Sequence, residues 1–570
     1  MRKLLDDTRI KPLRLFSFLL LAWVLLNIIQ SIFTEIGNDE SYYWIYSRYL
    51  DWGYYDHPPM IALIIKTGTL IFGNTPLGVR VFVIFTQALF LLVLFKLLDV
   101  KKTNENIGLF FIVVFSVVML QAYGFIATPD APLLAFTALF LLSYKNYVET
   151  HYSWKGAFLM ACCMAGLMYS KYHGAFVIIF VVLSNLRLFR RPSFYGASIL
   201  ALMLFLPHIL WQFYHEFPSL KYHLVERSKQ FQWSYFPDFL VNQLPVFNPF
   251  TLGAGIYVLF HRKHNDYFER ALKYLFSGFL IFFFFWNFKG RVEPHWTIAA
   301  AVPLVILVVR EAITNIKLKK YVYRVILPSL VLLFLMRLFM LVDVLPVHTE
   351  WHGDKRKVSD LKAIAGSKPV VFLSGFQMPS KYRFYTASEA HCIGVFDYRN
   401  TQYDIWNFDE AYWGKPVVVD MGGDTSFVKP TLSGKNEFNL SFVDKYQPYK
   451  KIKINLRKPV TELKLGESVR IPITIENPYA QDFEINHPFM PLQMYMIADV
   501  KYNNEWKHAL EKVDAEFDSE IIPSGGFVNG EITFVAPNSL EGEGTVFFAP
   551  GTPIFYPATL QKPVKMRFFK

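Results

Sequence analysis

The sequence predicts a polytopic α-helical membrane protein followed by a globular region outside the membrane. Of its 570 residues, 53% are hydrophobic and 18% are charged, whereas a soluble domain carries about a quarter charged residues. The long apolar runs lie within residues 13–345, and residues 346–570 have the mixed composition of a soluble chain. With 56 Phe against 30 Gly, the chain is not disordered, collagen-like or a disulfide-dense secreted scaffold.

The apolar runs are long enough to predict eleven membrane spans, several of them short. A spanning helix needs about 20 mostly apolar residues. The first run is expected to be a true span and not a signal peptide, because Asn27, Gln30 and Ser31 lead into Phe33 with no small-residue cleavage site. The predicted spans are 13–33, 77–98, 107–126, 131–147, 156–170, 174–189, 194–212, 241–260, 271–287, 296–310 and 324–345.

The positive charges predict an orientation for these spans. Cytoplasmic loops of membrane proteins carry an excess of Lys and Arg, so the basic N-terminal stretch is expected in the cytoplasm and, after eleven spans, the C-terminal region outside it. The same reasoning makes cytoplasmic the basic loops near residues 96–102, 145–155, 187–191, 262–273 and 310–324.

The first outer loop collects carboxylates and aromatic residues directly after the first span. Asp39 and Glu40 are followed by Tyr43, and Asp56 and His57 by two prolines. Charges at a bilayer boundary are costly unless they face water or protein, which favours a functional site. An interfacial belt also explains Tyr and Trp residues, but it explains the adjacent pair of acids less well.

Three further outer loops repeat this pattern on the same predicted side. Asp130 lies in a tight turn, where a helix-capping or turn role is an alternative. Lys171 could instead be a flanking residue whose ammonium reaches the interface. The candidate residues in these loops are Asp130, Lys171, His173, Lys289, Arg291, Glu293 and His295.

These residue types suit group transfer from an anionic substrate. Lys, Arg and His bind phosphate, and a carboxylate can take the proton of an attacking hydroxyl. His57 and His295, with nearby carboxylates, could instead hold a divalent metal, although no local spacing of ligands supports this alternative.

The outer-loop motifs resemble those of a known family. Residues 38–60 resemble the first outer loop of glycosyltransferase family 39, which comprises GT-C fold relatives of protein O-mannosyltransferases and of bacterial aminoarabinose transferases acting on lipid A. Residues 127–132, 170–174 and 291–296 are similar to further motifs of the bacterial branch. The resemblance covers the membrane part and does not extend to residues 346–570.

The resemblance implies an inverting transferase that takes a sugar from a polyprenyl-phosphate carrier without a required cofactor, although a divalent metal is possible. It implies Asp39 as the base, with Glu40 beside it. His57 stands where the aminoarabinose transferases have Lys, and Tyr42 where they have Arg, which shifts the expected phosphate contacts to Lys171, His173, Lys289 and Arg291.

The same resemblance sets expectations for partners and location. The acceptor is expected to be lipid A or another glycolipid, a glycan or a protein, and membrane lipids are the other partners; nucleic acid is not among them. The expected location is a bacterial inner membrane with the C-terminal region in the periplasm.

The chain after residue 345 is predicted to form two domains. Apolar runs at 368–375 and 415–423 predict strands of a small α/β domain over 346–447. Alternating runs at 468–475 and 525–534 predict an immunoglobulin-like β-sandwich over 448–570. Covering the active-site side, guiding an acceptor and a purely structural part remain alternative roles.

Two other functions are alternatives to sugar transfer. A flippase or transporter of lipid-linked glycans would keep its charges near the bilayer midplane at broken helices, whereas these charges gather in outer loops. A membrane-anchored binding module would need only one span.

Overall fold

The computed structural model of the chain divides into two units, residues 1–354 and 355–570. The predicted boundary near residue 345 falls among residues 344–348, which lie outside the described residues. The structure describes residues 11–226, 231–263, 266–343, 349–373, 375–394, 399–422, 432–435, 438–458, 460–502, 505–555, 557 and 563–569.

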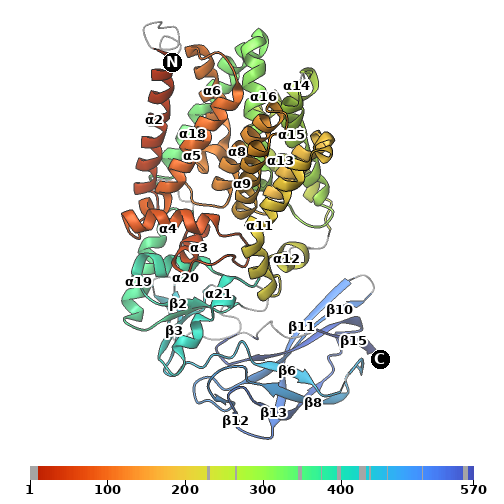
Figure 1. The fold of residues 1–570 in the computed structure, drawn as a ribbon. Coiled ribbons are helices and arrows are strands. Elements are labelled where there is room, and N and C mark those ends of the chain that lie inside the picture. Colours follow the sequence, from red (N-terminus) through yellow and green to blue (C-terminus); the bar gives the residue numbers. More distant parts are fainter. Residues whose placement is uncertain are drawn as a thin grey trace. The chain divides into compact units, whose positions relative to one another are not determined.

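The first unit is a bundle of apolar helices around one hydrophobic cluster (Figure 1). The helices that pack in this bundle range from 5 to 23 residues in length. They are α2 (Pro12–Phe33), α5 (Pro76–Leu98), α6 (Asn104–Ser116), α7 (Val118–Ala122), α8 (Asp130–Glu149), α9 (Trp154–Ser170), α10 (Gly174–Ser184), α11 (Pro192–Tyr214), α13 (Tyr235–Phe247), α14 (Pro249–His261), α15 (Tyr267–Trp286), α16 (Ala301–Thr314), α17 (Ile316–Tyr321) and α18 (Leu327–Phe339).

Each of the eleven predicted spans overlaps one of these helices, but the count of eleven spans is not confirmed. Among the described residues, five helices are long and apolar enough to cross a membrane, or six if α13 and α14, bent by 103°, form one span. Helices such as α10, with 11 residues, are shorter than the roughly 20 residues that a span needs. The prediction of an apolar, membrane-type helical region is confirmed, and its number of spans stays open.

Two helices of the loop predicted to be the first outer loop lie across one end of the bundle, α3 (Asn38–Arg48) and α4 (Met60–Phe72) (Figure 1). The span prediction did not include α4. Gly68 of α4 faces Gly78 of α5, and a Cβ at Gly68 would lie 2.1 Å from the Gly78 carbonyl oxygen. These two glycines therefore permit the close contact that holds α4 against the bundle.

The second unit begins with a five-stranded sheet in the order β2-β1-β3-β5-β4. The first three strands are parallel, and β5 runs antiparallel to both of its neighbours. Strands β1 and β3 lie within the predicted strand runs at 368–375 and 415–423. The elements are α19 (Asp354–Ala365), β1 (Val370–Phe372), α20 (Gln377–Thr386), β2 (Ala390–Cys392), α21 (Gln402–Trp406), β3 (Val417–Asp420), β4 (Leu432–Lys435) and β5 (Phe438–Val443).

The rest of the unit is β-rich, with an eight-stranded sheet in the order β6-β8-β13-β11-β10-β14-β15-β7 and a short pair, β9 and β12. β11 is long enough to pair with both β10 and β13, so the eight strands of the larger sheet are continuous. The immunoglobulin-like arrangement stays a prediction. The strands are β6 (Lys453–Leu456), β7 (Glu462–Lys464), β8 (Ser468–Glu476), β9 (Phe483–Glu484), β10 (Gln493–Tyr502), β11 (Glu505–Phe517), β12 (Ile521–Ile522), β13 (Phe527–Val535), β14 (Gly542–Gly551) and β15 (Val564–Phe569).

The α/β part and the β-rich part share a hydrophobic cluster. Val419 of β3 belongs to the same cluster as Tyr446, Tyr479 and Phe555. The predicted division near residue 447 therefore falls inside one compact unit, because this cluster joins side chains from both of its sides.

Candidate active site

A buried ion pair fixes the start of α3, the helix that carries the two predicted acids. Arg80 of α5 donates from Nε to Glu40 Oε1 at 2.8 Å and from Nη2 to Glu40 Oε2 at 2.5 Å. The Glu40 carboxylate also accepts from the amides of Ala127 and Gly37, both at 2.8 Å. Glu40 thus ties α3 to α5 and to the loop that precedes α8.

The Glu40 carboxylate is held as an anion. It is 1% exposed and Arg80 is fully buried. Burial acts to raise the pKa of Glu40, but the Arg80 guanidinium and the amides of Ala127 and Gly37 outweigh it and hold that pKa below its ordinary value. A carboxylate with these four donors is better suited to fixing the helix than to taking a proton from a substrate.

Asp39 has a different environment although it precedes Glu40 directly. Its side chain is exposed, and it lies in the first turn of α3. Successive residues of a helix point about 100° apart, so the inward direction of Glu40 leaves Asp39 facing out. Of the two predicted acids, Asp39 is exposed and Glu40 is buried.

A second buried pair joins two of the other predicted residues. The Lys171 ammonium, just after α9, donates to both oxygens of Asp130 in the first turn of α8, each at 2.8 Å. Each residue is 3% exposed. Tyr123 is hydrogen-bonded to Asp130 and lies in the electric field of Asp39. Because Tyr123 interacts with both Asp130 and Asp39, the Asp130–Lys171 pair lies close to the start of α3.

Two predicted histidines lie near this pair and are uncharged, His173 buried and His57 half-buried. Burial first, and the positive charge of Lys171, lower the pKa of His57 to about 3 despite the nearby Asp56, and they lower the pKa of His173 well below its ordinary value. In both rings Nδ1 is buried and has no hydrogen-bond partner among the described residues. These two nitrogens are therefore candidate contacts for a ligand.

The second half of the first outer loop is anchored to its neighbours. The Tyr46 hydroxyl donates to Asp56 Oδ1 at 2.5 Å. His223 Nε2 lies 3.2 Å from the Asp56 carbonyl oxygen, and the His57 and Tyr43 rings meet edge to face at 5.6 Å. Asp56 is thus engaged at its side chain and its backbone, which fixes the orientation of His57.

Helix α11 holds the middle of the same loop. Trp211 Nε1 donates to Asp51 Oδ2 at 2.8 Å, and His208 Nδ1 lies 2.7 Å from the Trp52 carbonyl oxygen. Gly53 packs so closely that a Cβ there would lie 2.4 Å from the Trp211 ring. The conformation of this loop therefore depends on its contacts with α11.

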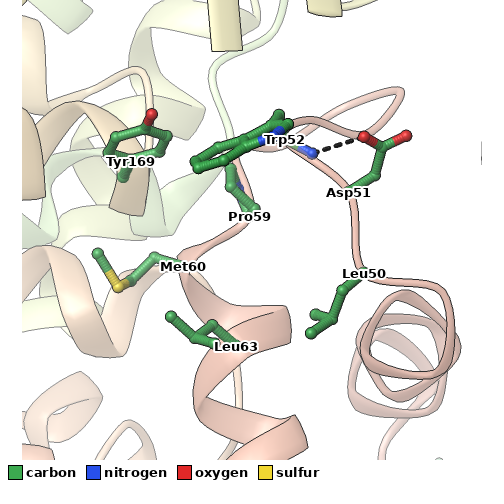
Figure 2. Close-up of a pocket in the computed structure, with 7 residues that line it drawn as sticks. All are labelled: Leu50, Asp51, Trp52, Pro59, Met60, Leu63 and Tyr169. Atoms are coloured by element: carbon green, nitrogen blue, oxygen red, sulfur yellow. Dashed lines mark hydrogen bonds between the residues drawn. The ribbon is translucent and has the colours of Figure 1, made fainter. Parts of the chain in front are cut away.

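One cavity is lined by residues of this loop, and a second is lined by residues of α9, α10 and α15 and of the segments that follow them. Figure 2 shows the first, of about 460 Å³, in which Trp52 and Tyr169 lie above an apolar floor. Its lining is mostly apolar and consists of Leu50, Asp51, Trp52, Pro59, Met60, Leu63 and Tyr169.

The second cavity, of about 250 Å³, joins aromatic and polar side chains. Phe283 and Trp296 pack against the His173 ring at 5.3 and 5.2 Å, and Tyr172 and His223 also line it. An apolar groove with polar groups at one side suits a ligand that has an apolar chain and a polar head.

The predicted residues of the fourth loop, Lys289, Arg291, Glu293 and His295, are less buried than the Asp130–Lys171 pair. Lys289 and Arg291 are exposed, and the Lys289 ammonium lies 5.0 Å from the Trp286 ring, which lines the second cavity. His295 contributes to the field at His173. Glu293 is half-buried at the start of η3 (Pro294–Ala300).

Sequence reasoning missed several residues of the site. Arg80 was included in a predicted span, although a charge inside an apolar run is itself a signal of function. Tyr123 and His223 had no such signal. For the metal alternative, no three His, Cys, Asp or Glu side chains in the described part of the chain gather as ligands.

The chain is similar to known proteins in both sequence and structure. Residues 56–211 match the family model for dolichyl-phosphate-mannose-protein mannosyltransferase. The apo crystal structure of ArnT from Cupriavidus metallidurans superimposes with a TM-score of 0.55 at 13% identity, over 75% of this chain and 97% of that one. The protein has the GT-C fold. The resemblance to family 39 glycosyltransferases is confirmed over residues 56–211.

Two other comparisons concern relatives of this GT-C protein. ArnT from the same organism bound to undecaprenyl phosphate also gives a TM-score of 0.55, at 14% identity and the same coverage. The lipid A galacturonosyltransferase RgtD of Rhizobium johnstonii is 24% identical over 292 residues, which are 48% of this chain and 60% of the relative. The chain thus matches less than two thirds of that relative's length.

Proposed function

We propose that this GT-C protein moves a sugar from a polyprenyl-phosphate carrier to a cell-envelope acceptor on the outer face of a bacterial inner membrane. The observation that carries the proposal is the exposed Asp39 on a helix start fixed by the buried Glu40–Arg80 pair. The family model of residues 56–211 and the GT-C fold support the reaction class.

In the proposed reaction Asp39 is the base. The acceptor hydroxyl oxygen attacks the anomeric carbon, its proton passes to Asp39, and the bond between that carbon and the phosphate oxygen breaks with its electron pair on the phosphate. A single displacement of this kind inverts the anomeric centre. General-base help of this kind contributes about 10²- to 10⁴-fold.

The leaving phosphate needs positive charge and hydrogen-bond donors. Lys171 already shares its charge with Asp130, so we assign the net positive charge to Lys289 and Arg291, which are exposed. His173 and His57 are neutral and can each donate one ring N–H.

The remaining predicted residues shape the pocket in this proposal. Tyr43 and Asp56 set the orientation of His57, and Glu293 and His295 begin the helical turn that carries Trp296. Glu40 acts as a positioning residue, since its carboxylate is occupied by Arg80 and two amides.

The carrier and acceptor classes rest on the relatives. One ArnT structure holds undecaprenyl phosphate, and the Rhizobium relative is named a lipid A galacturonosyltransferase. We therefore propose a polyprenyl-phosphate donor and rank lipid A or another glycolipid first among the acceptors, ahead of a glycan or a protein.

The test compares envelope glycolipids and glycoproteins by mass spectrometry in a strain that lacks the gene. Wild type is expected to restore one sugar mass on one acceptor, and Asp39→Asn is expected to restore none at equal membrane abundance. Asn keeps the size of the side chain but has no basic carboxylate. Full restoration by Asp39→Asn would refute catalysis by this residue and favour a flippase of lipid-linked glycans.

A further inference from the structure

A carboxylate from the far end of the first unit contacts the start of α3. The Asn38 amide donates to Glu350 Oε2 at 2.7 Å, across 312 residues of sequence. Glu350 is half-buried and belongs to residues 349–353, the short segment that precedes α19. Asn38 is the first residue of α3, directly before Asp39.

The same segment makes a second contact with this part of the chain. The Gly353 amide donates to Glu35 Oε1 at 3.3 Å. A Cβ at Gly37 would lie 3.2 Å from Glu40 Oε2, 3.4 Å from Glu350 Oε2 and 3.6 Å from Trp351 Nε1. Gly37 thus leaves room for two carboxylates and an indole against the start of the helix.

These contacts satisfy backbone donors that α3 cannot satisfy itself. The first amides of a helix have no partner within the helix. Glu40 accepts from the Gly37 amide and Glu350 from the Asn38 amide, and both negative charges are favourable at the positive end of the helix dipole. Two acids therefore hold the first turn: Glu40 of α3 itself, which is bound to Arg80 of α5, and Glu350 of residues 349–353.

We propose that Glu350 is a positioning residue for transfer, which fixes the first turn of α3 so that Asp39 meets the acceptor hydroxyl. The proposal rests on the proposed function, because it takes Asp39 as the base. A catalytic group must be held within about 0.5 Å of its productive place, and a misplacement of 1 Å can cost about a hundredfold in rate. Glu350 acts through the backbone and does not itself touch the substrate.

The first experiment measures the contact without any assay of activity. Hydrogen exchange is followed by mass spectrometry in the peptide that covers Gly37 to Ser41, on the full chain in lipid nanodiscs. Glu350→Ala removes the acceptor and is expected to speed exchange of the Asn38 amide about tenfold. Glu350→Gln keeps an acceptor oxygen without the charge and is expected to change exchange less than about threefold.

A matched control comes from the same segment. His352 contacts Thr349 at 2.8 Å and Phe339 at 5.6 Å between ring centroids, so His352→Ala disturbs residues 349–353 without removing the bond to α3. It is expected to leave exchange at Asn38 unchanged. Equal exchange in wild type and Glu350→Ala would overturn the proposal.

The second experiment measures transfer at several donor concentrations. Glu350→Ala is expected to lower kcat about tenfold or more with an unchanged KM for the donor, and Glu350→Gln to keep at least about a third of wild-type kcat. Should Glu350→Ala not fold, Glu350→Asp, which withdraws the acceptor by one methylene, takes its place.

The outcomes separate this inference from the proposed function. Faster exchange at Asn38 with an unchanged kcat would overturn the positioning role alone. A raised KM with an unchanged kcat would also overturn it, because the residue would then act on binding. If wild type transfers no sugar to any envelope acceptor while exchange behaves as expected, the proposed function fails first and the role of Glu350 in catalysis fails with it.

Discussion

The guanidinium of Arg80 meets the carboxylate of Glu40 at two points, Nε to Oε1 at 2.8 Å and Nη2 to Oε2 at 2.5 Å, with both side chains buried. Arg80 also donates to the Thr34 and Glu35 carbonyl oxygens, each at 2.8 Å. One guanidinium therefore joins the end of α2, the start of α3 and α5. The place of Asp39 depends on this junction.

We expect Arg80→Ala to destabilise the protein by about 3–5 kcal/mol, because it leaves the Glu40 carboxylate buried without its partner. The measurement is thermal unfolding of the detergent-solubilised protein, together with its abundance in membranes. The double variant Glu40→Gln with Arg80→Met is expected to lose less than Arg80→Ala alone, since it leaves no unpaired buried charge. Equal stability of wild type and Arg80→Ala would contradict this account.

Gly53→Ala is expected to loosen the first outer loop from α11, since the added Cβ would meet the Trp211 ring at 2.4 Å and His208 Nδ1 at 2.9 Å. Overpacking of this kind costs about 1–3 kcal/mol. Limited proteolysis within residues 49–58 is the measurement, and faster cleavage is expected in the variant. Gly253→Ala in α14 is the control, because a Cβ there meets nothing within 4 Å. Cleavage at the wild-type rate in Gly53→Ala would show that the loop yields without cost.

Protonation of His57 is expected to destabilise the folded protein as the pH falls. The pKa of His57 is lowered to about 3, below the roughly 6.5 of an unfolded histidine. Between these values the unfolded chain binds more protons, so stability is complete above about pH 6.5 and decreases as the pH falls toward 3. His57→Asn should show a smaller loss of thermal stability between pH 7.5 and pH 5 than wild type. Parallel losses in both proteins would assign the effect to other groups.

The sequence predicted the location of this site better than the partners within it. Asp39, Asp130, Lys171 and His173 were found because acids, cations and imidazoles at the membrane boundary need a reason to be there. The structure brings Asp130 and Lys171 together and places them near Asp39 through Tyr123. A pair of this kind follows from which helices are neighbours, and the local pattern carries no such information.

The partners of Glu40 and Asn38 show why the rest could not be predicted. Arg80 lies inside the apolar run 77–98, which was predicted as a membrane span, and Glu350 is separated from Asn38 by 312 residues. Helix α4 was missed because its 13 residues are too few for a span. The number of spans is not confirmed for the same reason, since apolar runs also form helices such as α10, with 11 residues, that are shorter than a span.

Arg291 provides the sharpest test of how the carrier phosphate is bound. Its side chain is exposed, so Arg291→Ala is expected to leave thermal stability within about 0.5 kcal/mol of wild type. Loss of a guanidinium from a phosphate site should raise the KM for the polyprenyl-phosphate donor about tenfold. Arg291→Lys should recover part of this loss, since Lys keeps the charge but not the two-point contact.

The control for Arg291 is an arginine with similar exposure on the predicted cytoplasmic side. Arg190, at the end of the turn Leu186–Arg190, is exposed, and Arg190→Ala is expected to leave the KM for the donor unchanged. Because both variants lower the net charge by the same amount, a general effect of charge on the anionic carrier would raise both KM values equally. If the KM for the donor rises only in Arg291→Ala, the increase reflects lost contact between Arg291 and the phosphate. If the KM does not change in Arg291→Ala, Lys289 is the remaining exposed candidate among the predicted cations.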